Sequence, residues 1–125
     1  MDAIHRYPDA VGYSRKNDFV TFRIDSAQGI RMTRAQARPT VQIDNDRVKV
    51  TEWRFAPGAE TGYHRHEMDY VVVPMTTGAL LLETPGGEVR SPLTAGLSYS
   101  RSAGVEHNVI NDNDHEFVFV EIEMK

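Results

Sequence analysis

From about residue 19 to its end, the chain alternates short apolar runs with clusters of turn residues. Proline and glycine stand at the breaks and not inside the runs, and no run shows the period of a long helix. This pattern predicts an all-β chain of about ten short strands. An antiparallel double-sheet barrel is the architecture that it favours.

The last apolar run, residues 117–124, alternates most regularly. Its even-numbered positions are all apolar, and we predict that they face the core. Its odd-numbered positions begin with two phenylalanines and end with two glutamates, and we assign them to the outer face. Exposed aromatic residues need cover, which predicts a second sheet or a homodimer. The even-numbered set is Val118, Val120, Ile122 and Met124, and the odd-numbered set is Phe117, Phe119, Glu121 and Glu123.

The chain has 125 residues, which suits one domain with one core. Residues 1–18 are polar, and we predict an N-terminal arm there, followed by a barrel domain over residues 19–125. Within that domain, residues 19–24 read as the first strand. Residues 26–38 have weak periodicity, which leaves a turn of helix or a loop open.

Composition narrows the classes of partner. The net charge of -4 argues against nucleic acid, because phosphate binding needs a basic face. No apolar run approaches the ~18 residues of a membrane span, and the first residues lack an export signal. The chain has no cysteine, which excludes disulfides and thiolate ligands. We therefore expect a cytoplasmic protein whose metal ligands, if any, are His, carboxylate, Tyr or water.

Three histidines carry the strongest chemical signal. His64 and His66 are two residues apart, so on a strand they point to the same side. His107 must come from another strand, after a turn at Gly104, and Asn111 can brace the loop beyond it. Neutral imidazoles suit a divalent transition metal such as Fe, Zn, Ni or Mn. Three protein ligands leave open coordination positions, as catalytic sites require.

These residues fall into two glycine-punctuated motifs that resemble those of the cupin family, G-x5-H-x-H-x(3,4)-E-x6-G and G-x5-P-x-G-x2-H-x3-N. The resemblance implies a single-domain jelly-roll barrel, an antiparallel double-stranded β-helix, with the three histidines as metal ligands. Residues 55–74 (FAPGAETGYHRHEMDYVVVP) are further similar to small bacterial cupins associated with beta-alanine degradation. The matched positions are Gly58, His64, His66, Gly78, Gly96, Gly104, His107 and Asn111.

Two positions depart from the motifs. Ser102 replaces a proline, and the motif glutamate falls at Tyr70 or Val71, neither of which is a carboxylate. Asp69 can reach the ion if the turn is short, or it begins a strand in solvent. Tyr70 can point inward as a phenol ligand or hydrogen-bond donor, or it packs as an ordinary strand residue.

Three neutral imidazoles leave the two charges of a divalent ion uncompensated, so the site should attract an anion such as a carboxylate. The arrangement resembles the three-histidine iron sites of thiol dioxygenases, which are also cupins. Tyr99 and Arg101 share one strand face and are further candidates for the site. Arg101 can bind a carboxylate in bidentate fashion, or it is a rim arginine paired with a surface acid.

Three functions fit these observations. The first is a metal-dependent enzyme, dioxygenase-like or acting as a Lewis acid, on a small metabolite that carries a carboxylate. The second is an accessory cupin that holds a ligand or metal without turnover. The third is a metal-free barrel whose histidines hydrogen-bond one another. As partners we expect a small-molecule ligand or substrate and a second copy of the chain, and neither nucleic acid nor membrane.

Overall fold

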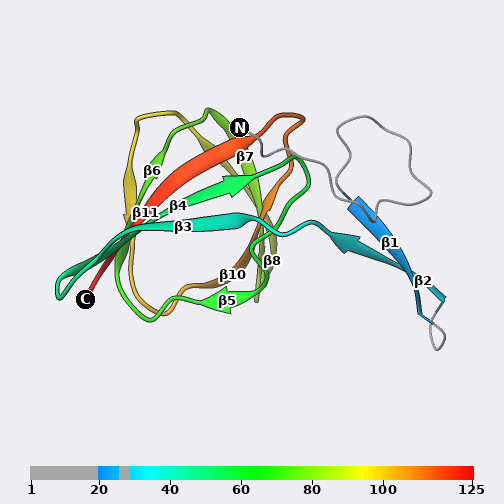
Figure 1. The fold of residues 1–125 in the computed structure, drawn as a ribbon, viewed down its shortest axis with the longest axis horizontal. Coiled ribbons are helices and arrows are strands. Elements are labelled where there is room, and N and C mark those ends of the chain that lie inside the picture. Colours follow the sequence, from blue (N-terminus) through cyan, green and yellow to red (C-terminus); the bar gives the residue numbers. More distant parts are fainter. Residues whose placement is uncertain (1–19, 26–28) are drawn as a thin grey trace.

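The computed structural model describes the backbone of residues 20–25 and 29–125 and the side chains from residue 33 onward. These residues build two antiparallel sheets that face each other, as the sequence predicts (Figure 1). Within the described residues, no helix is long and apolar enough to cross a membrane. The first sheet has the order β5 (His64–Arg65), β10 (Glu106–Asn111), β7 (Gly78–Thr84) and β8 (Gly87–Leu93). The second has the order β3 (Arg38–Asp44), β4 (Val48–Phe55), β11 (Phe117–Met124), β6 (Tyr70–Pro74) and β9 (Tyr99–Arg101).

A separate hairpin precedes the barrel. Strand β1 (Val20–Asp25) pairs with β2 (Gly29–Arg34) in antiparallel register. The reading of residues 26–38 as helix or loop is therefore wrong over 29–34, where pairing with β1 supplies the backbone partners that the weak local pattern does not reveal. The predicted arm, residues 1–18, lies outside the described residues.

Strand β11 lies in the middle of the five-stranded sheet, and its two faces are the reverse of the prediction. Phe117 and Phe119 are 0% and 5% exposed and point into the barrel. The rings of Phe119 and Phe55 pack with their centroids 5.5 Å apart. The even-numbered positions consequently lie on the outer side of the sheet, and Met124 at their end is 37% exposed. Because the two phenylalanines are core residues, they give no reason to expect a homodimer.

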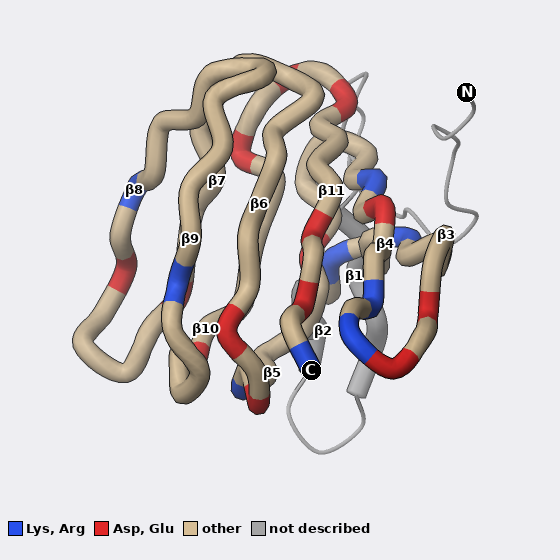
Figure 2. The backbone as a smooth tube through the Cα atoms, turned by 90° about the vertical axis from the view of Figure 1, so that its left-hand side faces the viewer, with Lys and Arg blue, Asp and Glu red and all other residues tan. Residues whose placement is uncertain are grey.

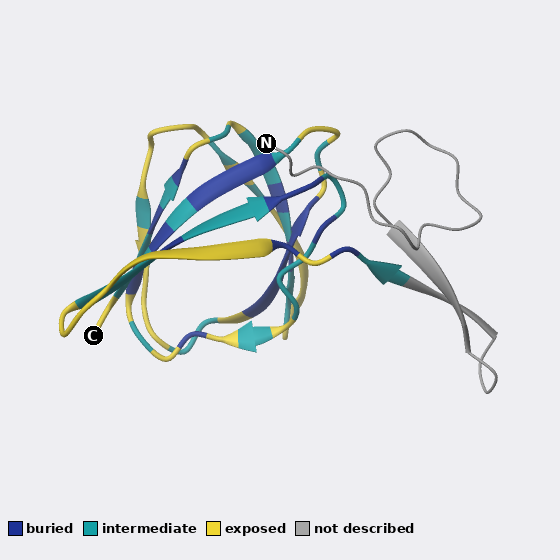
Figure 3. Cartoon of the chain, viewed as in Figure 1, coloured by how far each residue is buried: buried dark blue, intermediate teal, exposed yellow. Residues whose placement is uncertain are grey.

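Burial is uneven across this sheet (Figure 3). Strand β3 at its edge is exposed along its whole length, whereas the first three residues of β11 are all buried. The apolar core therefore occupies one end of the barrel, around Phe55 and Phe117. Polar side chains occupy the interior towards the other end of β11, where Glu121 faces inward.

Asn111 ties the two sheets together at the end of β10. Its side chain is fully buried, and its Nδ2 donates to the carbonyls of Phe55 (3.2 Å), Ala56 (3.3 Å) and His115 (2.8 Å). Its Oδ1 accepts the backbone N–H of Asn113 at 3.0 Å. One amide thus satisfies backbone groups on both sides of a loop, which confirms the predicted bracing role.

Replacing Asn111 with alanine is expected to lower the free energy of unfolding by about 3 kcal/mol, because several backbone groups lose a buried partner. Urea unfolding followed by circular dichroism measures this loss. The matched control is Asp112→Ala, which removes only an exposed ion pair with Arg90 and should cost less than about 1 kcal/mol. Equal effects of the two substitutions would contradict the bracing role.

Candidate metal centre

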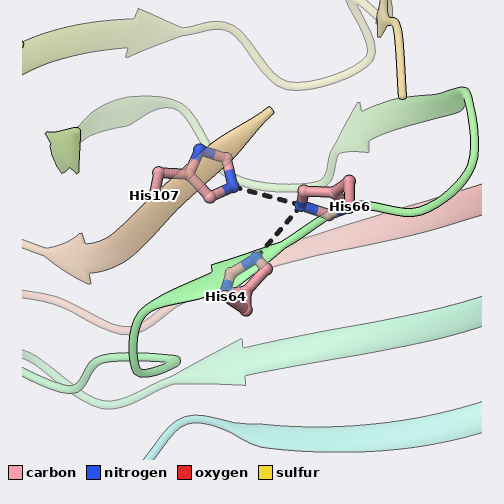
Figure 4. A group of neighbouring side chains, drawn as sticks. All are labelled: His64, His66 and His107. Atoms are coloured by element: carbon pink, nitrogen blue, oxygen red, sulfur yellow. Dashed lines mark hydrogen bonds between the residues drawn. The ribbon is translucent and has the colours of Figure 1, made fainter. Parts of the chain in front are cut away.

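The three histidines of the two motifs meet in space (Figure 4). His64 and His107 are directly paired across β5 and β10, and His66 follows β5 by one residue. The Nε2 atom of His66 lies 3.0 Å from Nε2 of His64 and 3.1 Å from Nε2 of His107. His66 and His107 are buried, and His64 is half-buried. The predicted convergence of three imidazoles from separate parts of the barrel is confirmed.

A braced loop orients His64. Its Nδ1 lies 2.8 Å from the carbonyl oxygen of Gly62, to which the ring donates, so Nε2 carries the lone pair. Gly62 has φ +90°, a conformation that a side chain would strain. The side-chain oxygen of Asn108 accepts the N–H of Gly62 at 2.9 Å. Asn108, which is buried on β10, was not recognised from the sequence as a support for this site.

The backbone on either side of His66 is held as firmly. The N–H of His66 donates to the carbonyl of Val105 at 2.8 Å, and its own carbonyl accepts the N–H of Gly104 at 2.8 Å. Gly104 has φ +101°, which lets the chain turn just before β10. Both motifs are therefore joined by backbone hydrogen bonds a few residues from the imidazoles that they supply.

The arrangement fits a divalent transition metal. Two ligand nitrogens at right angles around an ion, each with a bond of ~2.1 Å, are ~3.0 Å apart. The two short Nε2 separations, 3.0 and 3.1 Å, match this spacing. Three protein ligands leave further positions around such an ion open. Among the described residues, His64, His66 and His107 thus form a group that can hold such a metal.

Burial keeps two of these rings neutral. It lowers the pKa of His66 from 6.5 to about 4, with smaller contributions from His64 and Arg101. It lowers the pKa of His107 to about 3, with His64, His66 and Arg101 adding to the effect. Metal coordination needs unprotonated imidazole, so both rings are ready to bind an ion at neutral pH.

The position of the missing motif glutamate is filled by Tyr70, whose side chain faces inward. Tyr70 is 2% exposed, and its ring stacks on that of His66 with centroids 3.9 Å apart and planes at 17°. Burial raises the pKa of Tyr70 to about 12, so the phenol keeps its proton at neutral pH. Val71 is on the opposite face of β6.

Asp69 is not placed with the histidines. It is exposed, and its Oδ1 accepts the backbone N–H of Ala103 at 2.8 Å. Among the described residues, the acidic and histidine side chains close enough to share an ion do not include it. The structure thus supports the alternative that Asp69 is a solvent residue before β6, where it fastens a loop, and gives no support to its role as a ligand.

The histidines open onto a cavity of about 400 Å³ inside the barrel. Tyr99 and Arg101 of β9 both line it, as their shared strand face predicts. Arg101 is exposed, so it stands where the cavity meets solvent. The alternative of a rim arginine paired with a surface acid is not observed, because no described carboxylate lies within 4.0 Å of its guanidinium.

Glu121 is a second site residue, after Asn108, that sequence reasoning missed. It is 9% exposed and lines the cavity, with Oε2 3.8 Å from Nδ1 of His66. The pKa of Glu121 is raised to about 7, first by burial and then by the charge of Glu123, while a hydrogen bond from Trp53 and the charge of Lys49 act in the opposite direction. The sequence did contain a sign of this, because Glu121 and Glu123 lie on the same face of β11 as Phe117 and Phe119, and that face is the inner one.

These features define a small antiparallel β-barrel with a three-histidine centre in its interior. The sequence profile of the family described as Cupin domain matches residues 51–123, and the chain belongs to the cupin family. Over 92 residues it is 70% identical to the Beta-alanine degradation protein BauB of Pseudomonas aeruginosa, which covers 74% of this chain and 97% of that protein.

Solved structures agree with this assignment. A cupin domain from Bordetella pertussis Tohama I is 75% identical and has a TM-score of 0.75, covering 76% of this chain and 99% of that one. A conserved protein with a double-stranded beta-helix domain from Klebsiella pneumoniae is 21% identical, with a TM-score of 0.61 over 75% of this chain and 81% of that one. The second likeness shows the fold alone.

Acidification from pH 7 to pH 5 is expected to destabilise the metal-free protein. Below pH 6.5 His66 and His107 are protonated in the unfolded chain but stay neutral in the folded protein, where their pKa values are about 4 and 3. Their contribution to the free energy of unfolding is therefore lost as the pH falls towards these values. Glu121 acts oppositely, because its folded pKa of about 7 exceeds the ordinary 4.5 and its contribution is lost as the pH rises through that range.

Thermal melts of wild type and Glu121→Gln at the two pH values separate these effects. In the variant the two histidines still destabilise the fold on acidification, but the opposite effect of Glu121 is absent. Its melting temperature should therefore fall more between pH 7 and pH 5 than that of the wild type. A smaller fall in the variant than in the wild type would contradict the assignment.

Proposed function

We propose that this cupin is a metal-dependent enzyme that acts on a small metabolite carrying a carboxylate. The observation that carries the proposal is the approach of three Nε2 atoms, at 3.0 and 3.1 Å, beside a cavity that admits a small molecule. A divalent transition metal held there supplies Lewis-acid chemistry, or dioxygen chemistry when the metal is iron.

The chain's own residues favour an anionic ligand. Among the described residues, no carboxylate joins the three imidazoles in the group whose Nε2 atoms meet, and Tyr70 occupies the place of the motif glutamate. Arg101 presents, at the mouth of the cavity, a guanidinium that pairs with no described carboxylate and is suited to bidentate binding of a ligand's carboxylate. Both supports are physical and independent of the relatives.

Two tyrosines can position the bound molecule. Tyr70 and Tyr99 line the same cavity, and burial raises the pKa of each phenol. Both hydroxyls therefore keep their protons at neutral pH and can donate hydrogen bonds to an anionic oxygen. Their place beside His66 and Arg101 makes them candidates for catalytic residues.

The similarity to BauB suggests the metabolic setting. That relative is described as a beta-alanine degradation protein, and it shares 70% identity over most of both chains. We extend the setting to this chain and place its substrate among the small carboxylates of beta-alanine breakdown. Turnover of such a compound by the metal-loaded protein tests the enzymatic part, and metal binding without any turnover would leave an accessory binding protein instead.

The purified protein is expected to bind one divalent metal ion per chain, and His66→Ala should abolish that binding. Metal at 100 times its Kd should stabilise the fold by about 2.7 kcal/mol. Elemental analysis and thermal melts with and without a chelator measure both effects. The control is His115→Ala, since His115 is an exposed ring next to Asp114, away from the cluster. A metal content unaffected by His66→Ala would refute the three-histidine site.

The variant Arg101→Gln is expected to weaken binding of propionate to the metal-loaded protein about 10-fold or more, because it removes a charge-assisted pair of hydrogen bonds. Isothermal titration gives the Kd. Arg90→Gln is the matched control, since Arg90 is exposed on β8 and pairs with Asp112. Equal propionate affinity in wild type and Arg101→Gln would remove Arg101 from the site.

A further inference from the structure

Charged side chains cross the inner face of the five-stranded sheet in one row. Strand pairing sets Lys49 opposite Glu123, Glu123 opposite Tyr70, and Tyr70 opposite Arg101. All four line the cavity. Figure 2 shows the acidic positions on β11 and the basic position on β9 of the same sheet. The cavity wall therefore has a basic end at Arg101 and an acidic part at β11.

The acidic part is a pair of carboxylates. Glu121 is two residues from Glu123 on the same face of β11, and oxygens of both lie within 4.8 Å of each other and of a His66 ring nitrogen. Neither forms an ion pair with a described lysine or arginine within 4.0 Å. Glu121 is nine-tenths buried, so its carboxylate has little contact with solvent, and the charge of Lys49 acts on it only from beyond ion-pair distance.

We propose that the ligand of this cavity is a short zwitterionic amino acid, whose carboxylate binds at the histidine centre and Arg101 and whose ammonium group binds between Glu121 and Glu123. This inference rests on the proposed function and names its substrate class. It distinguishes a metabolite with a free amino group from one that carries a carboxylate alone.

A second metal ion at His66, Glu121 and Glu123 is the competing occupant, and the chemistry of imidazole disfavours it. A neutral imidazole has one lone pair and one N–H. When Nε2 of His66 joins the three-histidine centre, its Nδ1 carries the proton and cannot ligate. The remaining groups are two carboxylates, which accept the N–H bonds of an ammonium group.

Dimensions also select a short molecule. One strand, β6, separates β11 from β9, so their backbones are about 10 Å apart. Side chains extend inward from both, and the cavity of about 400 Å³ is shared with the histidine centre. The space between Arg101 and Glu123 therefore suits an amino acid with a few carbons between its charged groups.

Isothermal titration with β-alanine and propionate tests the proposal, because the two probes differ only in the amino group. The metal is zinc, which is redox-inert. In wild type, β-alanine should bind about 10-fold or more tightly than propionate. Glu121→Gln and Glu123→Gln should each reduce this preference at least several-fold, and they should not weaken propionate binding, because a negative charge near an anion is removed. The control is Glu88→Gln, an exposed carboxylate on β8.

The possible outcomes distinguish a failure of this inference from a failure of the proposed function. If wild type binds propionate as tightly as β-alanine, the proposal of a zwitterionic ligand is wrong, although the proposed carboxylate site still stands. A preference for β-alanine that survives both glutamine variants also overturns it. If wild type binds a second zinc ion that the two glutamine variants do not bind, the acidic pair is a metal site and the proposal is wrong. If neither probe binds, the proposed function fails as well.

Discussion

The whole site depends on the antiparallel pairing of β5 with β10. This short ladder sets His64 opposite His107, and the chain returns through Gly104 to bond with the backbone of His66. Without it, His107 has no reason to meet His66, which lies 41 positions earlier in the sequence. Asn108 and Asn111 reinforce the same strand by satisfying backbone groups of the loops around it. Buried amides are therefore as much a part of the centre as the histidines.

The two sheets supply different side chains to the site. The four-stranded sheet and its adjoining loops deliver the three imidazoles, whereas the five-stranded sheet supplies the charged and phenolic side chains of the cavity wall. Tyr70 contacts both groups of residues. Its ring stacks on His66, and on β6 it lies between Glu123 and Arg101 of the neighbouring strands. A metal centre and a polar recognition wall thus face each other across one small cavity.

Much of this arrangement could be predicted from the sequence. Motif spacing and strand alternation indicated the histidine cluster, the barrel, the brace at Asn111 and the common face of Tyr99 and Arg101. The reversed faces of β11 could not be predicted by hydrophobicity, since a barrel with a polar cavity breaks the rule that the most apolar face is the core. That reversal also concealed Glu121 and removed the two phenylalanines as a reason to expect a homodimer.

The remaining errors have local causes. Asp69 lies next to Tyr70 in sequence, but its direction is set by a loop contact with Ala103 that no residue pattern reveals. The first strand of the hairpin was predicted, but β2 was missed because it is specified by its pairing with β1 and not by a strong period of its own. In both cases the deciding partner is distant in sequence or carries no distinctive side chain.

An anomalous-scattering map of crystals of the metal-loaded protein tests the central claim most directly. The account predicts one peak within ~2.1 Å of the Nε2 atoms of all three histidines. A map with the ion elsewhere, or with the three rings bonded only to one another in the presence of saturating metal, would contradict it.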